Sequence, residues 1–291
     1  MKMGGTQTIW EKLGAIDKRI LYWVLFISLA IPYIKPLGLP VSIAETSYAL
    51  YNYINTLGPN DVVVMAIEFG VSAWSECLPG FVAVSKHLIQ RGVKIIYWCV
   101  GYTDCDLTME AVMARIPQLK GPGQPAGPGD YKYGVDWVYF GYIAGGETTV
   151  AQLADNIRNV LRTDKYGTPI DQIPLMKNVN SAKDIKLVVD STTGDYGDYY
   201  VRQWRMRYGT AVAEIGIAMN YSTFIPYYQA GLAVGALKGI RGAAEYEKLI
   251  GQLGEATTSL DALNISHLLV IIAIIFANIS YFMTRRKGGG R

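Results

Sequence analysis

Several polar side chains stand where predicted β-strands end, and their types suit ligand binding or proton transfer. These residues are Glu68, Asp104, Asp190, Ser191 and Thr192. The carboxyl ends of parallel strands meet at one edge of a sheet, where α/β proteins bind ligands, so we predict a small-molecule site there. Two acids at adjacent strand ends, such as Glu68 with Asp104 or Asp190, could instead share a proton in acid–base catalysis. Turns and helix caps also use these residue types, so a structural role is the third interpretation.

Gly145 and Gly146 follow a further predicted strand and lead into a predicted helix. Backbone N–H groups at a helix N-terminus attract anions, so both glycines belong to the candidate ligand site. An ordinary turn is the alternative interpretation of the pair.

The chain lacks the motifs of the common nucleophilic, nucleotide-binding and zinc enzymes, namely GxSxG, a Walker A loop, GxGxxG after a strand, and HExxH. Its two histidines do not stand at strand ends, because His87 lies in a predicted helix and His267 begins an apolar terminal run. We therefore expect no catalytic residue of these kinds, no metal site and no cofactor. A non-enzymatic role is favoured, and the question of enzymatic activity stays open.

Cys99 and Cys105 are six residues apart across a predicted loop. Outside the cytoplasm they could form a disulfide that stabilises the fold by about 2 kcal/mol. Cys77 would then be left over. Three buried free cysteines is the equally weighted alternative.

Short β-rich runs alternate with longer helical runs along the middle of the chain. This pattern predicts an α/β fold, a doubly wound, mostly parallel five-stranded sheet of the flavodoxin or Rossmann type, with strand order 2-1-3-4-5. The predicted strands are 61–69, 94–100, 135–143, 184–189 and 211–219. The predicted helices are 75–90, 108–119, 148–162, 199–208 and 227–253. The glycine- and proline-rich run 121–129 is predicted to be a loop.

Two apolar runs near the ends of the chain predict transmembrane helices at 20–41 and 263–284, because about 20 apolar residues cross a bilayer. The second run is followed directly by Arg285, Arg286 and Lys287. Lysine and arginine also gather in the N-terminal tail, whereas the region 45–266 holds 18 basic and 22 acidic residues. By the positive-inside rule both tails, 1–19 and 285–291, are expected in the cytoplasm and the α/β domain, 42–262, outside it.

Glycines recur every four residues in the predicted helix 227–253, and a further glycine follows. They are Gly231, Gly235, Gly239 and Gly242. Each glycine in a helix interior costs about 1 kcal/mol relative to alanine, so close approach to another element is expected. That element is the domain's own sheet, a helix of another subunit, or the membrane.

Three stretches, Glu76–Pro79, Tyr131–Asp136 and Gly239–Glu247, resemble a family of prokaryotic two-helix membrane-anchored α/β proteins. The resemblance implies the architecture and supplies no activity and no catalytic residues.

Composition narrows the function classes further. The chain is 51% hydrophobic with a net charge of +3, and it has no basic cluster away from its termini. A disordered chain and a nucleic-acid binder are therefore not expected. The first hypothesis is a non-enzymatic membrane protein whose domain assembles with copies of itself or with other membrane subunits. The expected partners are therefore these subunits and the lipid bilayer. The alternatives are an extracytoplasmic small-molecule-binding or sensory domain, and a membrane-bound hydrolase that uses strand-end carboxylates.

Overall fold

The computed structural model describes residues 17–288, and its side chains as far as Met283. The described residues form two units. One is Pro40–Ala256, and the other combines the described parts of Met1–Leu39 and Thr257–Arg291. Each unit is considered separately below.

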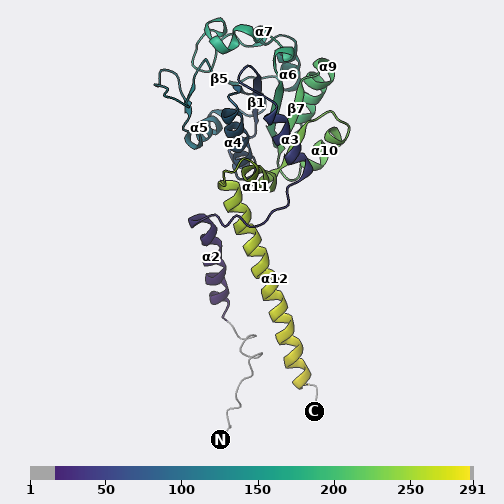
Figure 1. The fold of residues 1–291 in the computed structure, drawn as a ribbon. Helices are drawn as coiled ribbons and strands as arrows, with labels where there is room; N and C mark the ends of the chain where they lie inside the picture. Colours follow the sequence, from purple (N-terminus) through teal and green to yellow (C-terminus); the bar gives the residue numbers. More distant parts are fainter. Residues whose placement is uncertain (1–16, 289–291) are drawn as a thin grey trace. The chain divides into compact units, whose positions relative to one another are not determined.

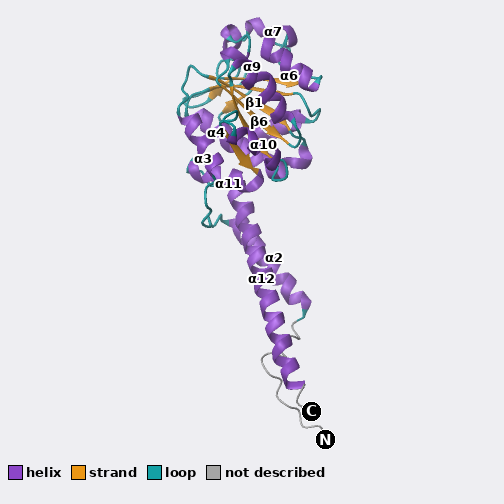
Figure 2. Ribbon diagram, turned by 90° about the vertical axis from the view of Figure 1, so that its right-hand side faces the viewer, coloured by secondary structure: helices purple, strands orange, loops and turns teal. Residues whose placement is uncertain are grey.

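A parallel six-stranded sheet runs through the unit Pro40–Ala256 (Figure 2). Its strands stand in the order β5-β2-β1-β6-β7-β8, which in chain order is the 3-2-1-4-5-6 arrangement of a Rossmann fold. The strands are β1 (Val62–Glu68), β2 (Lys94–Cys99), β5 (Trp137–Tyr142), β6 (Leu187–Thr192), β7 (Ala211–Gly216) and β8 (Gly235–Lys238). The doubly wound parallel class is confirmed, whereas the predicted order 2-1-3-4-5 and the count of five strands are wrong.

Helices cover both faces of the sheet (Figure 1). An apolar core lies between the sheet and the helices on each face. The first face packs against α3 (Glu45–Asn55), α4 (Trp74–Gln90), α5 (Cys105–Arg115) and α11 (Gly239–Leu249). The second face packs against α6 (Gly146–Asp155), α7 (Ile157–Val160), α8 (Tyr196–Tyr200), the π-helix η5 (Val201–Arg205), α9 (Met206–Tyr208) and α10 (Tyr221–Gln229). Short 3-10 turns lie at Val71–Ala73, Ile170–Gln172, Pro174–Asn178 and Ala182–Asp184.

The long helix expected over 227–253 is wrong, because α10 ends at Gln229, β8 follows, and α11 covers only Gly239–Leu249. Gly231 and Gly239 have φ angles of 73° and 48°, which place them in turns that a side chain disfavours. Gly235 lies on β8 against Leu50 of α3, and Gly242 of α11 lies against the backbone of Leu237. The four glycines therefore serve turns and close packing inside the domain.

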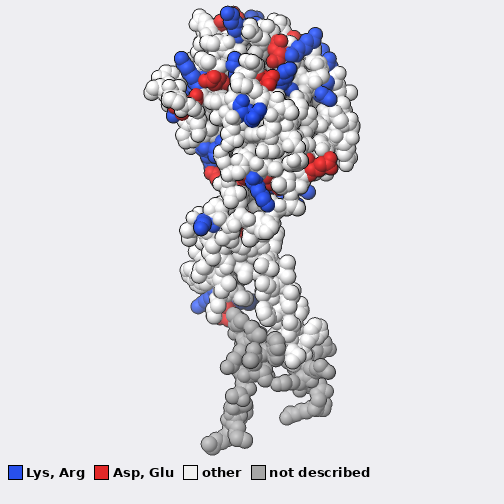
Figure 3. Space-filling view, viewed as in Figure 1, with Lys and Arg blue, Asp and Glu red and all other residues white. Residues whose placement is uncertain are grey.

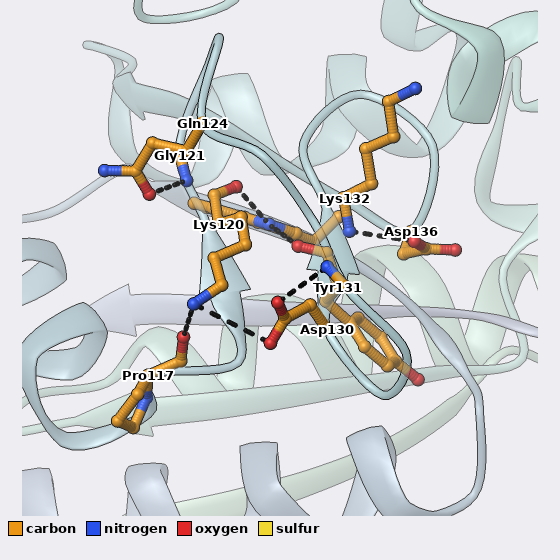
Figure 4. A network of polar contacts seen from close by, with 10 residues as sticks. Pro117, Lys120, Gly121, Gln124, Asp130, Tyr131, Lys132 and Asp136 are labelled. Carbon is orange, nitrogen blue, oxygen red and sulfur yellow. Dashed lines mark hydrogen bonds and ion pairs between the residues drawn. The ribbon is translucent and has the colours of Figure 1, made fainter.

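The glycine- and proline-rich run 121–129 is a loop closed at its base by a small parallel ladder of β3 (Leu119–Lys120) and β4 (Tyr131–Lys132). Figure 4 shows the polar contacts there: Lys120 Nζ lies 3.7 Å from Asp130 Oδ1 and donates to the carbonyl of Pro117 at 2.8 Å. The backbone N–H of Lys132 donates to Asp136 at 2.9 Å (Figure 4). These contacts fix the base of the loop to the domain.

The second unit contains α2 (Lys18–Ile34) and most of α12 (Glu255–Gly288). Among the described residues one helix is long and apolar enough to cross a membrane, Glu255–Met283. Most large apolar side chains on α2 and along this stretch are exposed, and few charges appear on these helices (Figure 3). The expected span 20–41 is not helical throughout, because α2 ends at Ile34. Pro36 follows, and a residue before proline disfavours helical geometry.

A buried carboxylate joins the chain after α2 to α12. Asp261 on α12 is 2% exposed and accepts three backbone hydrogen bonds. They come from Leu37, Gly38 and Leu39 at 2.8, 2.9 and 3.0 Å. Gly38 has a φ of 62°, and such a turn directs successive N–H groups at one anion.

We expect the Asp261→Asn variant to expose these three amides. An amide side chain has one acceptor oxygen and no charge, whereas hydrogen bonds to charged groups contribute about 1.5–3 kcal/mol. Hydrogen exchange at residues 37–39 should be at least about tenfold faster, since a tenfold change corresponds to about 1.4 kcal/mol. Peptides from β1 and β6 are the internal control. Unchanged exchange at 37–39 would show that the carboxylate does not hold this segment.

Candidate functional site

Three acidic side chains are buried on one face of the sheet. Glu68 ends β1, Asp190 lies on β6 and Glu214 lies on β7, with exposed fractions of 0%, 0% and 3%. Side chains alternate between faces along a strand, and all three point to the side of the second core. Asp190 is in register with Glu214 on the neighbouring strand. We call these three residues the acidic cluster.

Within the acidic cluster, Glu68 is held in place by several hydrogen bonds. Its carboxylate accepts hydrogen bonds from the backbone N–H groups of Val100 at 3.0 Å and Gly101 at 2.6 Å. The hydroxyl of Tyr200 on α8 donates to it at 3.4 Å. Burial nevertheless raises the pKa of Glu68 to about 8. Its proton is therefore exchangeable near neutral pH.

Asp190 is completely buried, and neither of its carboxyl oxygens has a hydrogen-bond partner in the described part of the chain. Burial, followed by the nearby carboxyl groups of Glu68, Glu214 and Asp198, raises the pKa of Asp190 well above its ordinary value. A buried polar group without a partner is rare in native proteins and requires an explanation. Protonation removes the charge of Asp190 but leaves its oxygens without partners, whereas a ligand that supplies donors and positive charge satisfies both requirements.

Glu214 occupies a space that two glycines leave open. A Cβ atom on Gly197 or on Gly216 would collide with its carboxyl oxygens. Its Oε1 has no hydrogen-bond partner among the described residues, and burial raises the pKa of this group well above its ordinary value. The local sequence is thus shaped around this carboxyl group.

The acidic cluster lies under the helical segment α8–η5. Trp98 Nε1 donates to the hydroxyl of Tyr200 at 2.8 Å, and Trp204 Nε1 donates to the carbonyl of Val150 at 3.0 Å. Outside, Arg202 of η5 forms two hydrogen bonds with Glu147, at 3.0 and 3.1 Å. A π-helix is less stable than an α-helix and is found often at functional sites. The segment α8–η5 therefore forms a cover over the acids. Side-chain contacts hold this cover in place, and part of its backbone is the π-helix.

Loops beyond the strand ends form a polar rim next to the acidic cluster. Tyr102 and Thr193 share a hydrogen bond between their hydroxyls, and Asn220 Nδ2 donates to the carbonyl of Gly194 at 3.2 Å. These residues follow β2, β6 and β7. The switch point of the strand order lies between β1 and β6, so the rim and the cluster stand where Rossmann-type sheets bind ligands.

The structure brings together only some of the predicted site residues. Glu68 and Asp190 belong to the acidic cluster, and Thr192 is in register with Glu68. Ser191 points to the opposite face, where its hydroxyl donates to the carbonyl of Ile215 at 3.3 Å. Asp104 accepts from the backbone N–H of Val71 at 2.9 Å and is not part of the cluster.

Gly145 and Gly146 follow β5, which β2 separates from β1. Both glycines form the turn into α6, and the Thr149 hydroxyl caps this turn by donating to the carbonyl of Ala144 at 2.7 Å. They are not beside the acidic cluster. The turn interpretation of this pair therefore describes the structure better than the ligand-site interpretation.

Sequence reasoning missed Glu214 and Tyr200. Glu214 is the one charge in the run 211–217, and alternation places it on the same face as Val212. That pattern was a usable signal. Tyr200 gave none, because its contact with Glu68 depends on how α8 crosses the sheet.

Of the two alternatives for the cysteines, the structure has the second: Cys77, Cys99 and Cys105 are all free and buried, with no disulfide between Cys99 and Cys105. The thiols of Cys99 and Cys105 interact with each other. Cys99 Sγ also donates to the carbonyl of Tyr102 at 3.0 Å, and the Tyr139 hydroxyl donates to Cys105 Sγ at 3.3 Å. Each thiol thus has partners that compete with a disulfide.

Purified without reductant and then denatured, the protein should react with three equivalents of a thiol reagent, one for each cysteine. The native protein should react much more slowly, because all three thiols are buried and the reagent reaches them only when the fold opens. One equivalent after denaturation would instead demonstrate a disulfide between Cys99 and Cys105.

The described residues contain no group of three His, Cys, Asp or Glu side chains arranged to hold a metal ion. The fold and the site together define a Rossmann-type α/β domain with an enclosed acidic cluster, on a chain that also carries a membrane-length helix.

No family model matches the chain, and no curated protein matches it. Among solved structures, trehalose-6-phosphate synthase OtsA is similar, with a TM-score of 0.31 and 8% sequence identity. The match covers 89% of this chain and 49% of that chain, so this chain spans about half of that structure's length. A likeness of this size establishes neither a shared activity nor a shared ligand.

Proposed function

We propose that the α/β unit is a membrane-anchored binding domain for a small, positively charged ligand, which it takes up at the acidic cluster. The observation that carries this proposal is the carboxylate of Asp190, which is fully buried and has no hydrogen-bond partner among the described residues. Its position at the carboxyl edge of the sheet, near the switch point, supports a binding role.

Electrostatics decides the class of ligand. Three acids lie together, and the groups that act on Asp190 are Glu68, Glu214 and Asp198, all of them carboxyl groups. A buried charge is tolerated only when it is paired, and otherwise the group takes up a proton. When no cation is bound, burial favours the protonated forms of these acids. An ammonium or guanidinium group supplies both the missing donors and the missing charge, so it replaces those protons.

Access requires movement of the cover. The acids have almost no exposed surface, so a ligand reaches them only when α8–η5 shifts away from the sheet. For this movement the π-helix must rearrange and the ion pair between Arg202 and Glu147 must break. Ligand binding in this arrangement is coupled to a conformational change and to proton release.

The test is thermal unfolding of the full chain in nanodiscs at pH 7 with 1,4-diaminobutane, and with 1,4-butanediol as the uncharged control. We expect the diamine to raise Tm and to release protons into a weakly buffered solution, and the diol to do neither. Asp190→Asn should lose the response, because the carboxylate that pairs with the ammonium group is gone. Glu110→Gln, at an exposed acid, is the matched control.

Two outcomes would contradict the proposal. One is an equal response of the native protein to diamine and diol. The other is an undiminished diamine response in Asp190→Asn, which would locate amine binding elsewhere on the domain.

Assembly and acid–base catalysis stay predictions. The glycines that suggested assembly contact the domain's own elements or form turns, so they lend no support to a subunit interface. Catalysis gains one favourable observation, since a Glu68 with a pKa of about 8 suits a general acid near neutral pH. A binding role needs no reacting partner and accounts directly for Asp190.

We further propose a two-pass topology with both termini in the cytoplasm and the domain outside. The apolar, exposed surface of α2 and the basic tails support it. The native cysteines are buried, so an introduced surface cysteine can be labelled selectively. In intact cells an impermeant maleimide should label Lys177→Cys, and it should label Thr6→Cys only after permeabilisation. The reverse pattern would place the domain in the cytoplasm.

A further inference from the structure

Two adjoining cavities lie on the first face of the α/β unit, away from the acidic cluster. Their volumes are about 290 and 180 Å³. Both are lined by Lys86 of α4, Arg115 of α5 and Gln252 of the loop after α11. Lys86 and Arg115 therefore border both cavities.

The larger cavity has an apolar wall, and the smaller one is lined with amide side chains. The apolar wall consists of Pro79, Val82, Ala83, Ile250 and Leu253. The amides are Gln90, Gln118 and Gln252. An apolar wall beside two cations matches a molecule that has an anionic group and a short apolar part.

Two cations, Lys86 and Arg115, line the larger cavity together with two carboxylates, Glu247 and Glu255, but these four groups form a single ion pair among the described residues. Lys86 has no ion pair within the part of the chain that the structure describes, and Arg115 Nε pairs with Glu255 at 2.8 Å. Glu247 already accepts from the backbone N–H groups of Gly254 and Ala256 at 2.9 and 3.0 Å. Lys86 is therefore available to bind an anion. Arg115 is paired with the exposed carboxylate of Glu255, which an incoming anion can displace.

We infer that these cavities form a binding site for an amphiphilic anion, with a phosphate or carboxylate group between Lys86 and Arg115 and an alkyl group on the apolar wall. Arg115 binds the anion through its guanidinium fork, and Lys86 supplies a second charge-assisted hydrogen bond. Glu255 competes with the ligand for Arg115. The site is independent of the acidic cluster and of the function proposed there.

The first experiment measures protection of Lys86 from an amine-acylating reagent by mass spectrometry, with the full chain in phosphatidylcholine nanodiscs. Lys177, exposed and remote from both cavities, is the internal control. Butyl phosphate should protect Lys86 and leave Lys177 unchanged. Inorganic phosphate and butanol should each require at least about tenfold higher concentrations, because each has only half of the matching chemistry. Equal protection by phosphate, equal protection by butanol, or none by butyl phosphate would overturn the inference.

Two variants should move the butyl phosphate affinity in opposite directions. Arg115→Gln should weaken binding about tenfold, because a charge-assisted hydrogen bond is lost. Glu255→Gln should strengthen it, because the competing charge is removed from Arg115. A purely structural ion pair between these residues would instead leave the affinity unchanged in both variants.

Varying the lipid composition of the nanodiscs distinguishes an anion from the bilayer from an anion in solution. Replacing part of the phosphatidylcholine by phosphatidic acid should protect Lys86 without added ligand if the bilayer supplies the anion. If only butyl phosphate protects, the site takes its anion from solution. Either result supports the site. If neither phosphatidic acid nor butyl phosphate protects Lys86, the inference is contradicted.

Discussion

Between pH 6.5 and pH 8 the protein should lose stability as the pH rises. The unfolded Glu68 ionises with a pKa near 4.5, whereas burial raises its pKa in the folded protein to about 8. Between these values the folded protein binds more protons than the unfolded chain, so the free energy of unfolding decreases with increasing pH. Burial raises the pKa of Asp190 and of Glu214 as well, and both act in the same direction.

His87 determines which pH interval is informative. Its imidazole is partly buried, and burial followed by the charge of Arg91 lowers its pKa from 6.5 to about 4. Below pH 6.5 the unfolded chain takes up a proton at His87 that the folded protein does not bind, and this opposes the contribution of the acidic cluster. At pH 6.5 His87 is half protonated in the unfolded chain and neutral in the folded protein, and this opposing contribution decreases as the pH rises, so the acidic cluster dominates the slope toward pH 8.

Thermal unfolding in nanodiscs measures the slope. Each additional proton bound by the folded state corresponds to about 1.4 kcal/mol per pH unit, which lowers Tm by about 3–6 °C in a domain of this size. Glu68→Gln should reduce the slope, and Glu110→Gln at an exposed acid should leave it unchanged. A Tm that is constant or rises from pH 6.5 to pH 8 would show that the cluster is ionised without penalty.

Gly235→Ala should destabilise the α/β unit strongly, whatever its oligomeric state. A Cβ atom at this position would lie 2.6 to 2.8 Å from the Cβ, backbone N and Cα of Leu50, because β8 and α3 are in direct contact. The backbone of a helix cannot move as a side-chain tip does, and overpacking of this kind costs about 1–3 kcal/mol. Chemical unfolding should therefore show a lower midpoint at an unchanged slope.

Gly58 provides the matched control for that substitution. A Cβ atom there would meet no other atom within 4 Å. Gly58→Ala should be neutral or should stabilise by about 0.4–1 kcal/mol through the unfolded chain. If Gly235→Ala were as stable as the native protein and changed only its assembled mass, the glycine would serve contacts between subunits.

The alternation of strands and helices was sufficient to predict the α/β class, because long apolar runs such as 61–69 are unlike amphipathic helices. It failed over 227–253, where β8 has only four residues and is built from Gly, Ala, Leu and Lys. Such a run has no periodicity that separates a strand from a helix. The spacing of Gly231, Gly235 and Gly239 happened to match a helical face, although Gly231 and Gly239 adopt positive φ angles in turns and Gly235 allows close packing against Leu50.

The site was predictable in part for a similar reason. Glu68 and Asp190 end or interrupt apolar strands, so their position at the carboxyl edge follows from the strand pattern alone. The order of strands in the sheet depends on long-range packing, and this order decides that β6 and not β5 lies beside β1. It separates Gly145 from Asp190 and brings Glu214 next to it.

The contact at Asp261 has a consequence for sequence variation. Because backbone N–H groups of residues 37–39 bind the carboxylate, the side chains of Leu37 and Leu39 take no part in those hydrogen bonds. Only the acid at 261 and the left-handed glycine at 38 are required by the chemistry. Among related sequences, these two positions should therefore change together or not at all, while residues 37 and 39 vary with the apolar surroundings.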